Sequence, residues 1–146
     1  MAGNATITGS LTANGKKLAD IAESVFVTGP VEAGDVIVAI GIGDDGLPRF
    51  SRATRARDPR VAGVISSDPS FTLADTKGRH PLAVSGIVRV KAVAPIAVGD
   101  LLVSSDMRGY ATRCTDSSGC PGAVIGKALQ DQNIGKGFVL MMVMLR

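Results

Sequence analysis

The sequence predicts an all-β fold: a compact β-barrel or sandwich of two pseudo-repeated β halves, with an extended N-terminal strand segment. Three observations lead to this prediction. From Ser24 onward the chain is a series of short aliphatic runs separated by turns that contain glycine. No segment has the apolar period of a long helix, and one turn motif occurs twice. Short strands at this spacing are typical of all-β sandwiches and barrels.

The composition restricts the kind of function that this domain can have. The 146 residues are 45% hydrophobic, a length and apolar fraction that suit one domain with a short appendage. Valine, alanine, isoleucine and leucine supply most of the apolar side chains, whereas Phe and Tyr together number five and Trp is absent. Small-molecule and sugar sites are usually lined with aromatic rings, so the composition argues against an enzyme pocket or a sugar-binding platform.

The N-terminal region, residues 1–23, is expected to be a shaft-like strand segment and linker. Between Gly3 and Lys16 the residues Ile7, Gly9, Leu11 and Ala13 share one side of an extended chain, which predicts a strand. Its few apolar side chains cannot form a core alone, so we expect it to pair with other copies of itself. Lys16–Glu23 is expected to form one helical turn, with Leu18, Ile21 and Ala22 on its apolar side.

Residues 24–146 are expected to form the β domain. Asp45-Gly46 lies in a predicted hairpin turn between residues 41 and 48. The predicted strands are Ser24–Thr28, Asp35–Ile40, Arg60–Ser66, Leu82–Ala92, Leu101–Ser104, Tyr110–Cys114, Ala123–Ala128 and Phe138–Leu145.

An internal repeat divides this domain into two halves, 29–92 and 94–146. Gly29–Val38 aligns without gaps on Ala94–Val103, an offset of 65 residues, through the pattern Pro-φ-x-x-Gly-Asp-φ-φ-Val, where φ is aliphatic. Proline restricts the backbone before the turn, glycine permits a positive φ angle, and the aspartate can accept bonds from the turn backbone. The predicted structural turn residues are Pro30, Gly34, Asp35, Pro95, Gly99 and Asp100.

Two further segments support the repeat. Gly46-Leu47 matches Gly109-Tyr110, and Val61–Gly63 matches Val124–Gly126, both at an offset of 63. The alternative is that a common strand-entry turn is used twice without duplication.

The C-terminal run Phe138–Leu145 contains no polar residue. Both faces of such a strand need cover, and an apolar strand left at an edge promotes aggregation. We therefore expect oligomerisation, and a central strand within the monomer is the alternative. The run is too short to cross a bilayer as a helix, so we expect no membrane insertion.

Charge gives little indication of a partner. The net charge is +3, and the five arginines between Arg49 and Arg60 are accompanied by Phe50 alone among aromatic residues. Single-stranded nucleic acids are usually held by basic grooves with stacking aromatics, so we expect no nucleic acid and interpret this stretch as a solvated loop or a subunit contact.

Cys114 and Cys120 are separated by five residues, a spacing that permits a disulfide and also permits two free thiols. Two thiols with His80, the one histidine, far away in the sequence do not make a structural zinc site. We therefore expect no metal and no cofactor.

No catalytic constellation is evident, and we expect no catalytic residues. Ser66–Asp68 and Ser104–Asp106 combine serine with aspartate, but such pairs beside turns usually cap the backbone. Asp44-Asp45 is expected to be solvated at a hairpin tip, and Gly41–Gly43 is too short for a phosphate-binding loop.

Five segments in this order resemble the C-terminal domain of phage-type tail fibre and neck appendage proteins, which are related to intramolecular-chaperone tail domains. They cover much of residues 19–146, and Gly3–Gly15 resembles the end of a fibre shaft. The segments are Asp20–Glu23, Asp58–Pro69, Pro81–Lys91, Val98–Asp106 and Ile125–Leu129.

This resemblance implies a homotrimeric structural or assembly module at the end of a fibre or appendage, in contact with other particle or fibre proteins. It implies a virion or phage-like particle as the location and the bacterial cytoplasm as the place of synthesis. Two alternatives stay open. One is an autoproteolytic chaperone domain that uses a serine near Ser66–Asp68 or Ser104–Asp106. The other is a receptor-binding tip that contacts the host cell surface through loops such as Phe71–Arg79.

Overall fold

The computed structural model describes residues 3–12, 15, 17–116 and 118–146. In this part of the chain it contains strands and no helix, which confirms the predicted all-β class. The strands are β1 (Asp20–Thr28), β2 (Val36–Ile42), β3 (Pro48–Arg52), β4 (Val61–Ile65), β5 (Phe71–Leu73), β6 (His80–Val93), β7 (Leu101–Ser104), β8 (Ala111–Arg113), β9 (Val124–Ala128) and β10 (Lys136–Val143).

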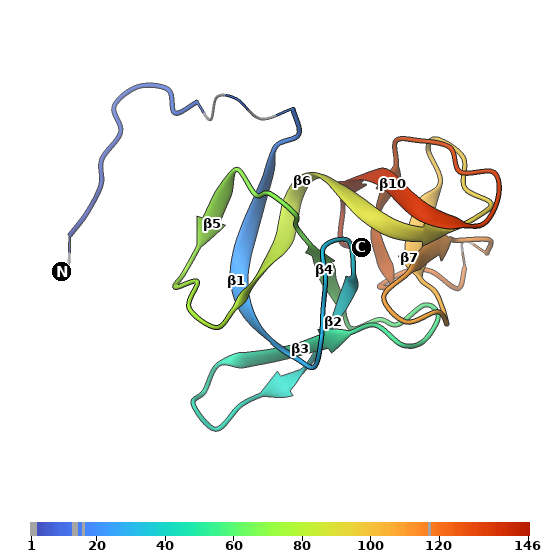
Figure 1. Cartoon of the computed structure of the whole chain (residues 1–146), viewed down its shortest axis with the longest axis horizontal. Coiled ribbons are helices and arrows are strands. Elements are labelled where there is room, and N and C mark those ends of the chain that lie inside the picture. The colour runs from blue at the N-terminus through green and yellow to red at the C-terminus, as the bar shows by residue number, and fades with distance from the viewer. Residues whose placement is uncertain (1–2, 13–14, 16, 117) are drawn as a thin grey trace.

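The strand pairings close two rings that share one long strand, β6 (Figure 1). In the first ring β6 pairs with β1 and β4, and β2 and β3 complete the circuit. In the second ring β6 pairs with β8 and β10, and β7 and β9 complete the circuit. The short strand β5 lies outside the first ring, parallel to β1. The 14 residues of β6 serve the first ring with their N-terminal part and the second with their C-terminal part.

The two rings use the same order of pairings. Each contains one parallel pair, β1–β3 in the first and β6–β8 in the second. The ladder between β2 and β4 has an irregularity after Ile37, and the ladder between β7 and β9 has one after Leu102, 65 residues later. The two rings thus correspond strand by strand, and β6 belongs to both of them and not to the first half alone.

One aliphatic core joins the two rings. Its largest cluster combines fully buried Val36 and Val64 from the first ring with Leu102, Ile125 and Met141 from the second. Full burial of such side chains stabilises a fold by about 1.5–3 kcal/mol each. Among the residues that the structure describes, all buried members of this cluster are aliphatic or methionine. Branched side chains of this size fill the thin interior of narrow rings.

In the N-terminal segment one expectation is wrong, and the other, a strand that pairs with further copies of the chain, stays a prediction. Residues 3–12 are exposed and form no strand pairing within the chain, and they run away from the rings (Figure 1). The predicted helical turn is wrong, because Asp20–Glu23 begins β1. Ile21 there pairs with Ser85 of β6 on one side and with Phe71 of β5 on the other, and ladders on both sides outweigh a weak helical pattern. Ala13 and Lys16 lie outside the described residues.

Two strands were not predicted. β3 begins at Pro48 and contains two arginines, and β5 has three exposed residues. Neither has a continuous apolar run or a clean alternation, so the sequence pattern contains no signal for them. β3 becomes a strand because it pairs antiparallel with β2 across the predicted hairpin turn and in parallel with β1. β5 becomes a strand because it pairs in parallel with β1.

Candidate functional site

The outer face of β10 exposes large apolar side chains to solvent. β10 pairs with β6 on one edge and with β9 on the other. Its edges are therefore those of a central strand, which was the alternative to oligomerisation. Val139 and Met141 point inward and are fully buried. Phe138 and Met142 point outward and expose 51% and 42% of their surface. The inner face of β10 is therefore buried in the core, and its outer face is exposed to solvent.

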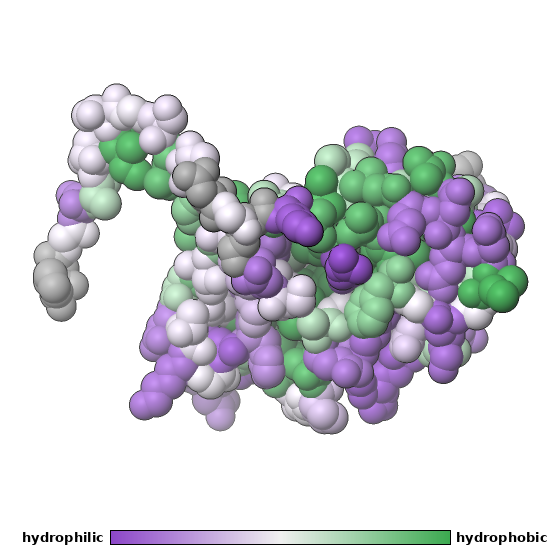
Figure 2. Space-filling model, turned by 45° about the horizontal axis from the view of Figure 1, so that its top comes forward, coloured by the Kyte–Doolittle hydropathy of each residue, from purple (hydrophilic) through white to green (hydrophobic). Residues whose placement is uncertain are grey.

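Neighbouring strand β6 extends this apolar face. Ile87 pairs with Met142, and Arg89 pairs with Leu140. Arg89 and Phe138 also line a cleft of about 310 Å³ with Gly34 and the turn around it. Figure 2 shows hydrophobic side chains gathered on the side of the molecule that carries β6 and β10. We call the surface of Ile87, Arg89, Phe138, Leu140 and Met142 the β6–β10 face.

A second cleft, of about 360 Å³, adjoins this face and receives one of the two predicted serine–aspartate pairs. Its lining includes Ser66, Ser67 and Asp68 together with Asp20 and Arg89. Gly15, Lys17 and Leu18, which belong to the linker before β1, line the same cleft. His80 does not belong to its lining and pairs with Val25 at the other end of the β1–β6 ladder.

The other serine–aspartate pair has a structural role. Ser104 is fully buried, and its hydroxyl donates to the carbonyl of Arg55 and accepts the backbone N–H of Asp58, both at 2.9 Å. The Ser105 hydroxyl lies 2.9 Å from the Tyr110 carbonyl and accepts the N–H of Met107. The Ser104 hydroxyl therefore holds the connection between β3 and β4 against β7, and the Ser105 hydroxyl holds the turn between β7 and β8. Asp106 is exposed.

The two Gly-Asp turns have the same backbone geometry. Gly34 and Gly99 have φ angles of 89° and 93°. In the first turn the Asp35 carboxylate accepts the N–H of Glu32 at 2.9 Å, and in the second the Asp100 carboxylate accepts the N–H of Ala97 at 2.9 Å. Pro30 and Pro95 precede these turns as the sequence has them.

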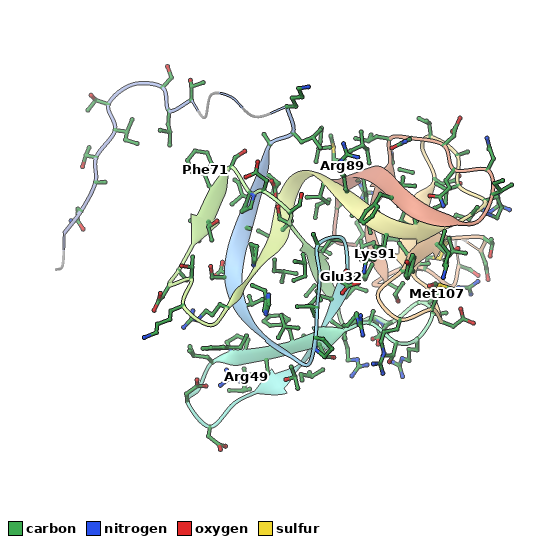
Figure 3. All side chains as sticks on the ribbon, in the orientation of Figure 1. Glu32, Arg49, Phe71, Arg89, Lys91 and Met107 are labelled. Atoms are coloured by element: carbon green, nitrogen blue, oxygen red, sulfur yellow. A yellow bond between two sulfur atoms is a disulfide. The ribbon has the colours of Figure 1, made fainter. Side chains whose placement is uncertain are left out.

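The first turn carries a buried charge cluster that sequence reasoning missed. Asp35 is fully buried, and its carboxylate lies 2.8 Å from the Lys91 ammonium. Lys91 also contacts Glu32 at 2.5 Å, and Figure 3 shows these two side chains together at the junction of the rings. The hydrogen bond and charge of Lys91 lower the pKa of Glu32. Burial works to lower the pKa of Lys91, but bonds and charges from Asp35 and Glu32 outweigh it and raise that pKa.

The arginine stretch is mostly tied to local carboxylates. Arg60 makes two bonds to the fully buried Asp58, at 2.9 and 2.7 Å, and these bonds lower the pKa of Asp58. Arg55 approaches the same carboxylate at 3.4 Å. At the hairpin tip, Arg49 pairs with Asp45 at 2.8 Å, so that carboxylate is paired as well as exposed. Arg52 makes a longer ion pair, 3.7 Å from Asp35. The Arg57 guanidinium donates to the Thr115 hydroxyl at 3.4 Å.

Cys114 and Cys120 are joined in a disulfide, with Cα atoms 6.3 Å apart, in the connection from β8 to β9. Among the described residues no group of histidine, cysteine or acidic side chains is arranged to hold a metal ion. In the same part of the chain no helix is long and apolar enough to cross a membrane.

The loop proposed to meet a host surface begins with β5 and returns to β6. Ala74, directly after β5, has a φ angle of 67°. The guanidinium groups of Arg79 and Arg49 each lie 4.5 Å from the centre of the Phe26 ring. This loop and the β2–β3 hairpin therefore both contact Phe26 of β1, and the two border a cleft of about 340 Å³.

No protein-family model and no curated protein matches the sequence. Solved structures do match the fold. Pre-mature gene product 12 of bacteriophage phi29 superposes with a TM-score of 0.67 at 12% identity, covering 99% of this chain. This chain spans 23% of that protein's length. The head fiber gp8.5 N base of the same phage aligns with a TM-score of 0.47 at 20% identity, covering 87% of this chain and 91% of that one.

The first of these similarities establishes the fold and no more. The first shows that two rings of this arrangement occur in a phage protein many times longer than one such unit. It is a match to a phage protein, and it does not single out the C-terminal tail domain.

Proposed function

We propose that this chain is a non-enzymatic structural module of a phage or phage-like particle, the terminal domain of a fibre or appendage that works as a homotrimer. It would be made in the bacterial cytoplasm and incorporated into the particle. The two rings would descend from one duplicated unit. The observation that carries this proposal is the exposed apolar β6–β10 face on a domain whose strands are otherwise paired and whose core is filled.

Two features support assembly through this face. Phe138 and Met142 are held by a strand paired on both edges, so they form a rigid surface. Contiguous exposed apolar surface of this kind usually marks a protein–protein interface. The N-terminal segment supplies further exposed apolar side chains, Ile7 and Leu11, on a stretch without an intrachain strand partner.

Light scattering after size exclusion at micromolar concentration tests the proposal. We expect three times the chain mass of 14.9 kDa. Phe138→Lys places a charge in the β6–β10 face and is expected to yield monomer. Ile134→Lys changes an apolar residue that is 87% exposed outside this face, and it is expected to preserve the trimer. A monomeric or dimeric wild-type chain would contradict the proposal.

The cleft with Ser66, Ser67 and Asp68 favours a second candidate, an autoproteolytic chaperone domain. Serine hydroxyls and carboxylates there adjoin the described linker residues Gly15, Lys17 and Leu18. The test is the intact mass of a longer chain, with native upstream sequence, after prolonged incubation. Cleavage that disappears in Ser67→Ala would support this candidate, and an intact wild-type product would eliminate it.

A further inference from the structure

A small cleft between the two rings is lined by two arginines and by no acidic residue. It lies where the β1–β2 turn, the end of β3 and the β7–β8 turn meet, and its volume is about 220 Å³. Arg52 and Arg108 line it together with the hydroxyl residues Thr28, Ser51 and Thr54, and none of its lining residues is acidic.

The two guanidinium groups are only partly compensated, and for Arg52 the compensation comes from Asp35 and from the charge of Glu32. The carboxylate nearest Arg52 is Asp35, at 3.7 Å. That carboxylate already accepts a bond from Lys91 at 2.8 Å and one from the N–H of Glu32 at 2.9 Å. Arg108 is exposed and makes no ion pair within the described part of the chain. The neighbouring Arg55 and Arg60 are, in contrast, engaged by Asp58.

Arg52 is also held in place. A Cβ atom on Gly109 would lie 2.9 Å from its Cδ and 3.1 Å from its Cγ, so the stem of Arg52 packs against this turn of the second ring. The N–H of Gly109 bonds the carbonyl of Ala53, and the carbonyl of Gly109 accepts the N–H of Val36. A cation fixed before a ligand arrives loses little side-chain entropy on binding.

We propose that this cleft binds the oxyanion of a phosphate or sulfate group carried by a larger molecule. Guanidinium groups match such oxyanions with paired, charge-assisted hydrogen bonds, and hydroxyls can complete their coordination. The cleft is smaller than the roughly 300 Å³ at which pockets for whole ligands begin, so it suits one charged group. This site is independent of assembly through the β6–β10 face.

Titration of backbone amide resonances with inorganic phosphate at constant ionic strength tests the site. We expect saturable shifts confined to Thr28, Gly29, Arg52 and Arg108. Sulfate is expected to compete. Dimethyl phosphate distinguishes two sources of the phosphate group. If it binds, the cleft accepts the phosphodiester of a polymer. If inorganic phosphate alone binds, the cleft accepts a terminal phosphate group.

Variants decide whether the cleft itself is responsible. Arg108→Ala removes an exposed side chain without touching the core and is expected to weaken phosphate binding about tenfold, the value of one charge-assisted bond. Arg113→Ala removes the same charge from an exposed position outside the lining and is expected to leave the affinity within about twofold. Shifts that grow linearly without saturation, or equal losses in both variants, would overturn the proposal.

Discussion

The two Gly-Asp turns begin from the same sequence pattern and the same backbone bonds, yet they perform different tasks. Asp35 in the first turn is fully buried, and its carboxylate holds Lys91 at the junction of the rings. Asp100 in the second is half-buried, and its turn exposes Val98, which is 62% accessible and donates its N–H to Asp131. The difference shows that a local motif determines a turn, whereas the tertiary contacts determine how much stability depends on it.

The largest expected effect separates the two aspartates. Asp35→Asn leaves Lys91, whose side chain is 9% exposed, without its buried countercharge, and such changes cost about 3 kcal/mol or more. Asp100→Asn weakens one hydrogen bond in a less buried turn and is expected to cost about 1 kcal/mol. Urea unfolding of both variants measures the difference. Equal losses would mean that the two turns contribute equally to the free energy of unfolding, which would contradict the prediction.

A pair of turn glycines gives the next effect. Gly109 and Gly46 have φ angles of 79° and 77°, so alanine is strained equally in both. A Cβ at Gly109 would clash with Asp35 and Arg52, whereas at Gly46 it meets open space. We expect Gly46→Ala to cost about 1 kcal/mol and Gly109→Ala about 2 kcal/mol more, measured by the same unfolding curves. Similar losses would contradict close packing between the rings at Gly109.

The connections that follow β3 and β8 differ in what holds them. Asp58 and Arg60 hold the first, and the Cys114–Cys120 disulfide holds the second. Closing a loop of this size stabilises a domain by about 2 kcal/mol. Cys114→Ser with Cys120→Ser is therefore expected to lower the free energy of unfolding by that amount. A reducing agent should lower the stability of the wild type and leave that of the variant unchanged; no response in the wild type would contradict the prediction.

The smallest expected effect is the pH dependence, to which Asp58, Glu32 and Lys91 contribute. The lowered pKa values of Asp58 and Glu32 contribute stability above the ordinary carboxyl values near 4, and this contribution is lost as pH falls through the lowered values. The raised pKa of Lys91 contributes stability below about 10.4, which is lost as pH rises through the raised value.

The urea midpoint should therefore be nearly constant between about pH 5 and 9 and fall on both sides. Asp58→Asn is expected to flatten the acid side and leave the alkaline side unchanged. An acid side of unchanged steepness in this variant would assign the acid response to other carboxyl groups.

The sequence was informative where local chemistry decides the structure. The two turns follow from glycine and aspartate at fixed spacing, and strands such as β7 and β9 follow from short aliphatic runs. In β10 the residue types do not alternate, yet burial does, because pleating alone sends Val139 inward and Phe138 outward.

What the sequence could not show depends on contacts between distant residues. β3 is a strand because β2 and β1 pair with it, and β5 is a strand because β1 pairs with it. Neither has an apolar pattern of its own. Lys91 reads as the polar side of an alternating strand, but the first turn covers it and supplies two carboxylates. Arg52 and Arg108 are far apart along the chain, and the junction of the rings alone brings them to one cleft.

The sharing of β6 has a mechanical consequence. Tension on the N-terminal segment enters at β1, whose ladder runs along the N-terminal part of β6, and the rest of β6 is a wall of the second ring. The two rings cannot be separated by dividing the chain, because both need β6 as one of their strands. We therefore expect the two rings to unfold together under force, because they share β6.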